Sequence, residues 1–298
     1  MHRITSQDEL VARIKQIKQR SRWKMPFSLK AVLTMSNPNG RVRHGWTYMH
    51  EPVDYQGTRI NVKVPALTTP VLLTWRKNVE AAYNQSFAIG VSPVGGLEAE
   101  ALTYKKLNQL GFPTLTSLQH LVEDHGFPLV KGVLLTEQIP YPENLQDLVT
   151  ADKYGRMGHY ASIAAKMKQL HGHGEIWVDS LPQNTMRNQG EILLFDFNLI
   201  PNPMLSEDQL QSLDLTNLCL SAAGRLERNY GDVMKPIIGV YDPSDKVREA
   251  MEKRLKIDVE TPRGRIATVI EEFFYLRPKY LLTREKATEA KRAMLKAL

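Results

Sequence analysis

Two acids and an amide stand at spacings that could support phosphoryl transfer. Asp179 and Asn184 lie five positions apart in VDSLPQN, and Asp196 lies inside the apolar run ILLFDFNLI. A carboxylate in an apolar strand is costly unless it is paired or binds a cation. Carboxylate and amide oxygens suit Mg²⁺, so Asn184 and Asp196 are the candidate metal ligands. Asp179 is the candidate general base, and with Asn184 it forms the candidate catalytic pair.

The competing interpretation of the first two residues is an ordinary polar turn. Asp and Asn beside Pro182 are common in loops, and on that pair alone the turn is the better interpretation. Asp196 changes the balance, because a third oxygen ligand follows in an apolar strand. His171 and His173 are two positions apart, which is a poor spacing for a metal site on a helix, so we expect His171 to pack at a helix end.

This stretch resembles the protein-kinase-like superfamily. That superfamily places an Asp and an Asn five apart in its catalytic loop and follows them with D-F-G, and here the segments are VDSLPQN and FDFN. LHGHG is similar to the L-H-x-x-G turn that precedes the loop in many members. Trp177 and Val178 stand where His and Arg are usual, so we expect no control by a phosphorylated activation loop. Asn198 replaces Gly, and Asn tolerates the same left-handed conformation.

The resemblance implies a Lys–Glu ion pair in the N-terminal half, with ATP and Mg²⁺ as cofactors. Glu100 in EAEALTYKKLNQLG is the expected Glu, with Glu98 as the reserve. Lys77 in VLLTWRKN is the preferred Lys for the α/β-phosphates, since it lies at a strand end closer to the helix. Lys63 in INVKVP and Arg76 remain open.

A nucleotide also needs a hinge that exposes backbone groups to the adenine. VLLTEQIPYPENL leads from a strand toward a helical region, and the resemblance makes Glu137, Gln138 and Ile139 the hinge residues. Glu137 and Ile139 are therefore candidate nucleotide-binding residues. The sheet region has no G-x-G-x-x-G, so a loop poor in glycine would have to cover the phosphates.

The elements that must position these residues divide into two kinds. Four segments in the N-terminal half are typical of strands between turn signals: FSLKAVLTM, RVRHGWTYMH, TRINVKV and TPVLLTW. A helix is predicted over 95–111, ending at Gly111, with its apolar face formed by Leu97, Ala101, Tyr104 and Leu107. KYGRMGHYASIAAKMKQLHGHG predicts a second amphipathic helix, and the chain beyond 206 is mainly helical.

We therefore expect an α+β fold of the bilobal protein-kinase-like type. The segment 1–26 would hold a basic helix over roughly 7–20 that opens at a Ser6–Glu9 capping box. A β-rich lobe with one helix would occupy 27–140, and a helical lobe with the catalytic loop 141–298. Within the superfamily, the chain is most similar to bacterial lipopolysaccharide core kinases of the Kdo and heptose type, over roughly 70–200. RIO-type and aminoglycoside-type kinases remain open.

Composition limits the partners. The net charge of +7 and pI near 9.3 suit nucleotides, phosphorylated glycans or an anionic membrane surface. The single cysteine, Cys219, excludes an intrachain disulfide and a cysteine zinc site and is expected to be buried. Neither a secretory signal nor a transmembrane segment is expected, so the predicted location is cytoplasmic. The resemblance to lipopolysaccharide core kinases implies a peripheral position at the inner membrane face.

The expected activity is ATP- and Mg²⁺-dependent phosphoryl transfer to a lipopolysaccharide-core sugar or another hydroxyl acceptor. The alternative is a pseudokinase-like protein that binds a nucleotide or a partner without turnover. Nucleic acid is not an expected partner, because only the net charge favours it. Asp214, in DLTNLCLSAA, is expected to serve as a cap or in a structural pair.

Overall fold

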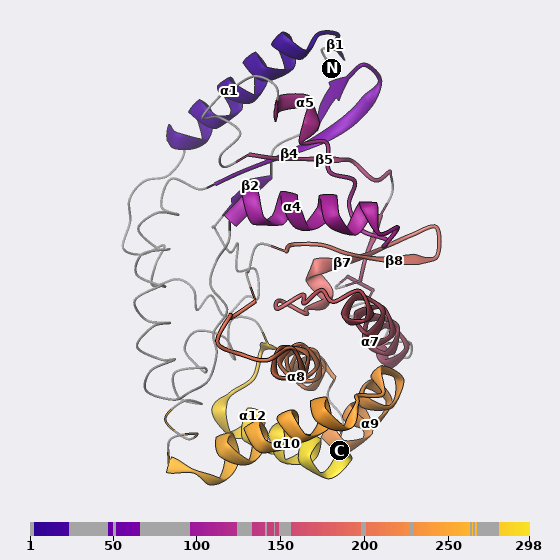
Figure 1. Ribbon diagram of the computed structural model, residues 1–298, viewed down its shortest axis with the longest axis vertical. Coiled ribbons are helices and arrows are strands. Elements are labelled where there is room, and N and C mark those ends of the chain that lie inside the picture. Colours follow the sequence, from indigo (N-terminus) through magenta and orange to yellow (C-terminus); the bar gives the residue numbers. More distant parts are fainter. Residues whose placement is uncertain are drawn as a thin grey trace. The chain divides into compact units, whose positions relative to one another are not determined.

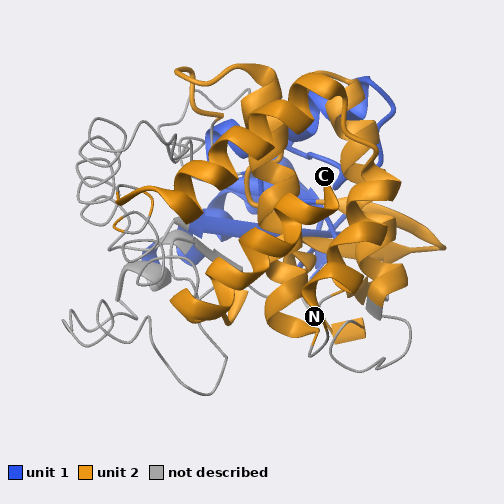
Figure 2. Ribbon diagram, turned by 90° about the horizontal axis from the view of Figure 1, so that it is seen from below, with its two compact units in different colours: residues 1–80, 93–141, 195–200 blue, residues 81–92, 142–194, 201–298 orange. Residues whose placement is uncertain are grey.

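The computed structural model shows a mixed α and β protein. It describes residues 3–23, 47–49, 52–65, 96–123, 133–140, 142–145, 147–148, 156–197, 201–226, 229–262, 264, 266 and 280–298. Strands gather in the N-terminal part of these residues and helices in the C-terminal part (Figure 1), so the expected α+β class is confirmed. Contacts divide the chain into two units (Figure 2). Unit 1 consists of residues 1–80, 93–141 and 195–200, and unit 2 consists of residues 81–92, 142–194 and 201–298. The domain limits drawn from the sequence stay predictions.

Unit 1 is built on a five-stranded sheet. Its strands are β1 (Arg3–Ile4), β2 (Thr47–Met49), β3 (Val53–Tyr55), β4 (Thr58–Pro65) and β5 (Leu134–Glu137). β4 is the organising strand, because β3 and β2 pair with its two ends and β5 pairs along its middle, all antiparallel, while β1 runs parallel to β3. The strand predicted at TRINVKV is confirmed as β4, and part of RVRHGWTYMH forms β2. The strands predicted at FSLKAVLTM and TPVLLTW lie outside the described residues.

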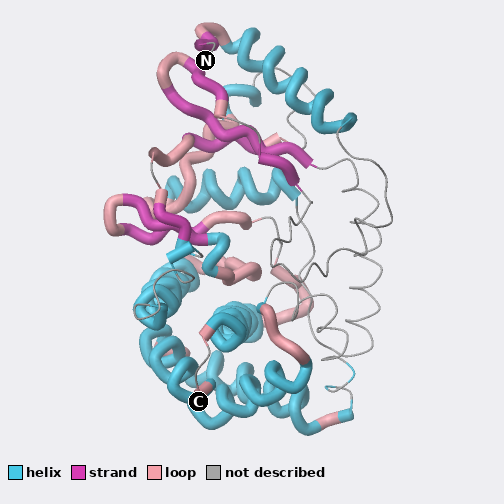
Figure 3. Tube along the Cα trace, turned by 180° about the vertical axis from the view of Figure 1, so that it is seen from behind, coloured by secondary structure: helices cyan, strands magenta, loops and turns pink. Residues whose placement is uncertain are grey.

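The two faces of this sheet carry different helices. Successive side chains of a strand point to opposite faces, so Lys63 faces away from Val62 and Val64. The valines join a buried cluster with Leu10 and Ile14 of α1 (Gln7–Trp23). α4 (Gly96–Gln109) contacts β4 and β5 as well, and Figures 1 and 3 show α1 and α4 on opposite sides of the strands. The short α5 (His120–Glu123) contacts α1.

Local signals in the sequence explain where α1 and α4 begin and end. The Glu9 N–H donates to Ser6 Oγ over 3.2 Å, as a capping box requires, but the Glu9 carboxylate accepts from Thr5 N–H rather than from Ser6. α4 ends before Gly111, which has φ +69°, and Phe112 N–H donates back to the carbonyl of Leu107. The predicted helix is confirmed, and all four residues of its predicted apolar face are buried: Leu97, Ala101, Tyr104 and Leu107.

Unit 2 holds a small sheet and five long helices among its described residues. The sheet is β6 (Glu143–Asn144), β7 (Thr185–Asn188) and β8 (Glu191–Leu194), with the short 3-10 helix η2 (Pro182–Asn184) before β7. The helices are α7 (Arg156–Gly172), α8 (Glu207–Arg225), α9 (Tyr230–Tyr241), α10 (Asp245–Glu260) and α12 (Arg284–Ala297). α7 confirms the second predicted helix. In the described part of the chain, no helix combines the length and apolar composition needed to cross a membrane.

Packing in unit 2 is mainly between helices. α7 and α12 both contact α9, and α10 contacts α8 and α12. Cys219 is buried in α8, as expected from the sequence. A buried ion pair joins α12 to α10, since Lys291 Nζ lies 2.7 Å from Asp258 Oδ2. Such pairs are strongly destabilising to break, so this one helps to fix how the two helices pack.

Candidate active site

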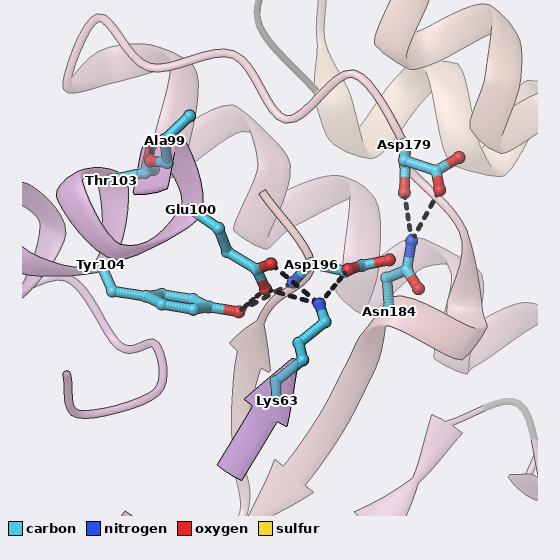
Figure 4. A network of polar contacts seen from close by, with 8 residues as sticks. All are labelled: Lys63, Ala99, Glu100, Thr103, Tyr104, Asp179, Asn184 and Asp196. Carbon is cyan, nitrogen blue, oxygen red and sulfur yellow. Dashed lines mark hydrogen bonds and ion pairs between the residues drawn. The ribbon is translucent and has the colours of Figure 1, made fainter. Parts of the chain in front are cut away.

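An ion-pair network in unit 1 centres on Lys63. Its Nζ lies 2.8 Å from Glu100 Oε2 and 2.7 Å from Asp196 Oδ1 (Figure 4). The three side chains are 13%, 2% and 24% exposed. When both acids are ionised, the group carries one excess negative charge, and a bound cation would offset it.

Three separate elements bring these groups together. Lys63 lies in β4 and faces away from the cluster that packs on α1. Glu100 lies in the second turn of α4. Asp196 follows the end of β8 by two residues and has φ +66°, a left-handed conformation that Asp tolerates better than most residues. The network therefore links a strand, a helix and a loop of unit 1.

Burial and charge shift the ionisation of this network. Burial raises the pKa of Glu100 to about 7, although the attraction of Lys63 opposes that rise. Burial alone would lower the pKa of Lys63, but Asp196 and then Glu100 outweigh it and raise that pKa above its usual 10.5. Lys63 is therefore a permanent cation near neutral pH, and Glu100 is the group of this pair that titrates there.

The partner of Glu100 differs from the one preferred from the sequence. Lys63 pairs with Glu100, whereas Lys77 was preferred because it is nearer to the helix along the chain. The decisive property is the position in the sheet: β4 is paired on both edges, and its Lys faces α4. Lys77 and Arg76 lie outside the described residues. Glu98 is exposed.

The predicted hinge begins at the end of β5. The Glu137 N–H donates to the carbonyl of Thr116 over 3.0 Å, and the Gln138 N–H donates to the carbonyl of Arg59 over 2.8 Å. These two amides are thus used by unit 1 itself. Ile139 follows directly and is half-buried. The nucleotide-binding roles of Glu137 and Ile139 stay predictions.

In unit 2, the structure brings Asp179 and Asn184 together. The Asn184 amide nitrogen donates to the Asp179 carbonyl over 3.0 Å and to its Oδ2 over 3.1 Å (Figure 4). Both residues are buried, and η2 between them shortens the path, with Asn184 N–H bonded to the carbonyl of Leu181. The amide nitrogen is therefore committed to Asp179, and the amide oxygen is the end that could bind a metal.

The oxygen ligands fit Mg²⁺ in their chemistry. Asn184 offers an amide oxygen and Asp196 a carboxylate, both hard ligands that Mg²⁺ accepts together with phosphate oxygens and water. Within the described ranges, no three His, Cys, Asp or Glu side chains gather to form a metal site.

A buried acid of α8 holds the loop that carries Asp179. Asp214 Oδ2 accepts from the Trp177 N–H over 2.9 Å and lies 3.0 Å from His171 Nε2. The Ser180 hydroxyl donates to the Asp214 carbonyl, and His171 Nδ1 lies 2.6 Å from the Tyr241 hydroxyl. The expected structural pairing of Asp214 and packing of His171 are confirmed. No pattern in the sequence predicts their link to the loop that carries Asp179, although an Asp in an apolar helix gives the same signal as Asp196.

The residue before Asp179 is held in a strained conformation. Val178 has φ +70°, which costs a β-branched residue about 1–3 kcal/mol. Its carbonyl accepts from the side-chain amide of Asn217 of α8, and the neighbouring Trp177 is fully buried. Strain of this kind persists where the surroundings impose it, and it is often found at functional sites. The observation favours a functional loop over an ordinary polar turn.

Comparisons with known proteins add little to this geometry. No family model and no curated protein matches the chain. A chain in the solved structure of WaaP in complex with acyl carrier protein is similar at 13% identity and a TM-score of 0.43, with 79% of this chain and 87% of that one covered. Similarity at this level establishes no function, so function has to be argued from the side chains.

Proposed function

We propose that the protein is an ATP- and Mg²⁺-dependent phosphotransferase of the kinase-like superfamily. The observation that carries the proposal is the ion pairing of the buried Lys63 with both Glu100 and Asp196. A cation held between a helix carboxylate and a loop carboxylate is the arrangement by which kinase-like enzymes bind phosphates and metal. The strained loop that presents Asp179 supports the same conclusion.

Each residue has a separate role in this proposal. Lys63, oriented by Glu100, binds the α/β-phosphates. Asp196 and Asn184 hold Mg²⁺, which when bound neutralises charge on the phosphates. Asp179 orients the acceptor hydroxyl and accepts its proton, and its contact with the Asn184 amide keeps the carboxylate in a fixed orientation.

The partners follow from the same proposal. The hinge at Glu137 and Ile139 would receive the adenine. The acceptor is a hydroxyl group, and the resemblance to lipopolysaccharide core kinases together with the net charge of +7 favours a phosphate-rich glycolipid at the cytoplasmic membrane face. Nucleic acid is not a partner in this proposal.

A second candidate is a pseudokinase-like protein that binds a nucleotide or a partner without turnover. Trp177 and Val178, which replace the usual His and Arg, favour it. The two candidates differ in one observable, which is transfer of the γ-phosphate. Transfer that is lost in Asp179→Ala would exclude the second candidate.

Thermal unfolding in the presence of nucleotide tests the binding step on which the proposed phosphotransferase depends. We expect ATP with Mg²⁺ to stabilise the wild type, by about 2.7 kcal/mol at a hundredfold excess over Kd. Asp196→Asn should lose the part of the stabilisation that needs Mg²⁺. Asp242→Asn is the matched control, because it removes an exposed carboxylate that is also paired with a lysine. A wild type that neither ATP nor Mg²⁺ stabilises would leave the proposal without a basis.

A further inference from the structure

The hydroxyl of Tyr104 closes a ring of polar contacts in unit 1. It donates to Glu100 Oε1 over 2.9 Å and accepts from the Asp196 backbone N–H over 2.9 Å (Figure 4). Lys63 bridges the same two acids on the other side. The four residues therefore form a closed cycle in which each one contacts two others.

Tyr104 is also a rigid part of the core. Its side chain is fully buried, and its ring meets the ring of Phe197 edge to face, with centroids 5.8 Å apart. Burial raises the pKa of the Tyr104 hydroxyl well above its usual value, so the hydroxyl keeps its proton and can donate. One side chain of α4 thus contacts both Asp196 and the residue that follows it.

We propose that Tyr104 is a positioning residue, whose hydroxyl holds the Asp196 segment and Glu100 in the arrangement that binds the Mg²⁺–nucleotide. This inference rests on the proposed function and deepens it. The hydroxyl acts through Glu100 and Asp196 and is not placed on the reacting atoms.

The Tyr104 hydroxyl contacts the backbone of Asp196 and not its carboxylate, and this difference matters for ligand binding. The Asp196 carboxylate is engaged by Lys63, and a bound metal and phosphates would draw these two groups apart. The contact from Tyr104 is to the Asp196 backbone, so it can persist while the carboxylate changes partner. It also holds Asp196 at φ +66°, where a non-glycine residue needs support from its surroundings.

The test compares Tyr104→Phe with Tyr160→Phe. Tyr160 is also fully buried, and its hydroxyl contacts the carbonyl and Oγ of Ser221, so both variants remove one buried, doubly bonded hydroxyl and keep the ring. Two quantities are measured on the full chain: hydrogen exchange of the peptide that contains the Asp196 amide, without nucleotide, and affinity for a non-hydrolysable ATP analogue with and without Mg²⁺.

We expect Tyr104→Phe to speed exchange at Asp196 about tenfold and to weaken Mg²⁺-dependent nucleotide binding about tenfold, as loss of a buried hydrogen bond would. Binding without Mg²⁺ should change much less, and Tyr160→Phe should change neither quantity. Unchanged exchange at Asp196, or equal Mg²⁺-dependent affinity in the two variants, would overturn the positioning role. A wild type that binds no nucleotide would instead overturn the proposed function and the role with it, whatever the exchange shows.

Discussion

Replacing Lys63 by Met should expose how strongly the network depends on one cation. Met keeps most of the buried apolar stem and removes the ammonium group. Glu100, which is 1% exposed, then loses its cation, and Asp196 loses the partner 2.7 Å away. Removing one partner of a buried ion pair typically costs about 3–5 kcal/mol. Because Asp196 is partly solvated, we expect about 3 kcal/mol at a pH where Glu100 is ionised.

The cost should depend on pH, and the sign follows from Glu100. In the wild type its pKa is about 7, above the usual 4.5, so its ionisation lowers the folding stability as pH rises between these values. Lys63 opposes this rise, so without Lys63 the pKa moves higher still. The wild type then loses no more stability from Glu100 above about pH 7, whereas the variant continues to lose it. The destabilisation by Lys63→Met therefore grows as the pH rises above about 7.

Urea unfolding of the nucleotide-free protein at about pH 6 and pH 8.5 measures both effects. Lys291→Met is the control, because it breaks a buried pair of the same type, with Lys291 Nζ 2.7 Å from Asp258, away from Glu100. It should destabilise by a similar amount, and its dependence on pH should be the same with and without Glu100→Gln, because Asp258 and not Glu100 loses its cation. Adding Glu100→Gln to Lys63→Met should remove the growth of its destabilisation with pH. The reasoning is refuted if Lys63→Met costs under about 1 kcal/mol at both pH values, or if the pH dependence survives in the double variant.

Three further predictions concern the loop and the nucleotide. Asp214→Ala should lower the free energy of unfolding in urea by about 3 kcal/mol and reduce ATP turnover, because the Trp177 N–H and His171 lose the carboxylate they contact. An unfolding curve equal to that of the wild type would contradict this. Val178→Asn should raise the free energy of unfolding by about 1 kcal/mol, because Asn tolerates φ +70°, and a lower melting temperature would show that no strain is stored there. The affinity for Mg²⁺–ATP should fall as the pH drops through about 7, because Glu100 takes up a proton there. Calorimetry that finds equal affinity at pH 6 and pH 8 would refute the role of Glu100 in orienting Lys63.

Much of the framework could be predicted from periodicity and end signals. α4 was predicted with its buried face and its end at Gly111, because a 3.6-residue apolar pattern and a left-handed cap are both local properties. The middle strand β4 was predicted from its alternation. Asp196 attracted attention because an acid in an apolar run is costly, and it does have a cationic partner.

The side-chain partners that could not be predicted from the sequence depend on contacts between residues far apart in the chain. Lys63 and Lys77 both follow strand-like residues, and Lys63 meets Glu100 because its side chain lies on the face of β4 that α4 contacts. Tyr104 was predicted as part of an apolar face, which is correct, but the partners of its hydroxyl come from Asp196, far along the chain. Asp214 likewise anchors the loop at Trp177, which lies 37 residues before it in the chain. Such contacts have no local pattern.

The most direct test of the central claim asks which lysine faces the phosphates of a bound nucleotide. An acyl-phosphate derivative of ATP transfers its acyl group to a lysine beside the phosphates, and peptide mass spectrometry identifies the labelled residue. We expect Mg²⁺-dependent labelling of Lys63 that excess ATP blocks and Asp196→Asn weakens. Labelling of Lys77 instead, or labelling of Lys63 that ATP does not block, would contradict it.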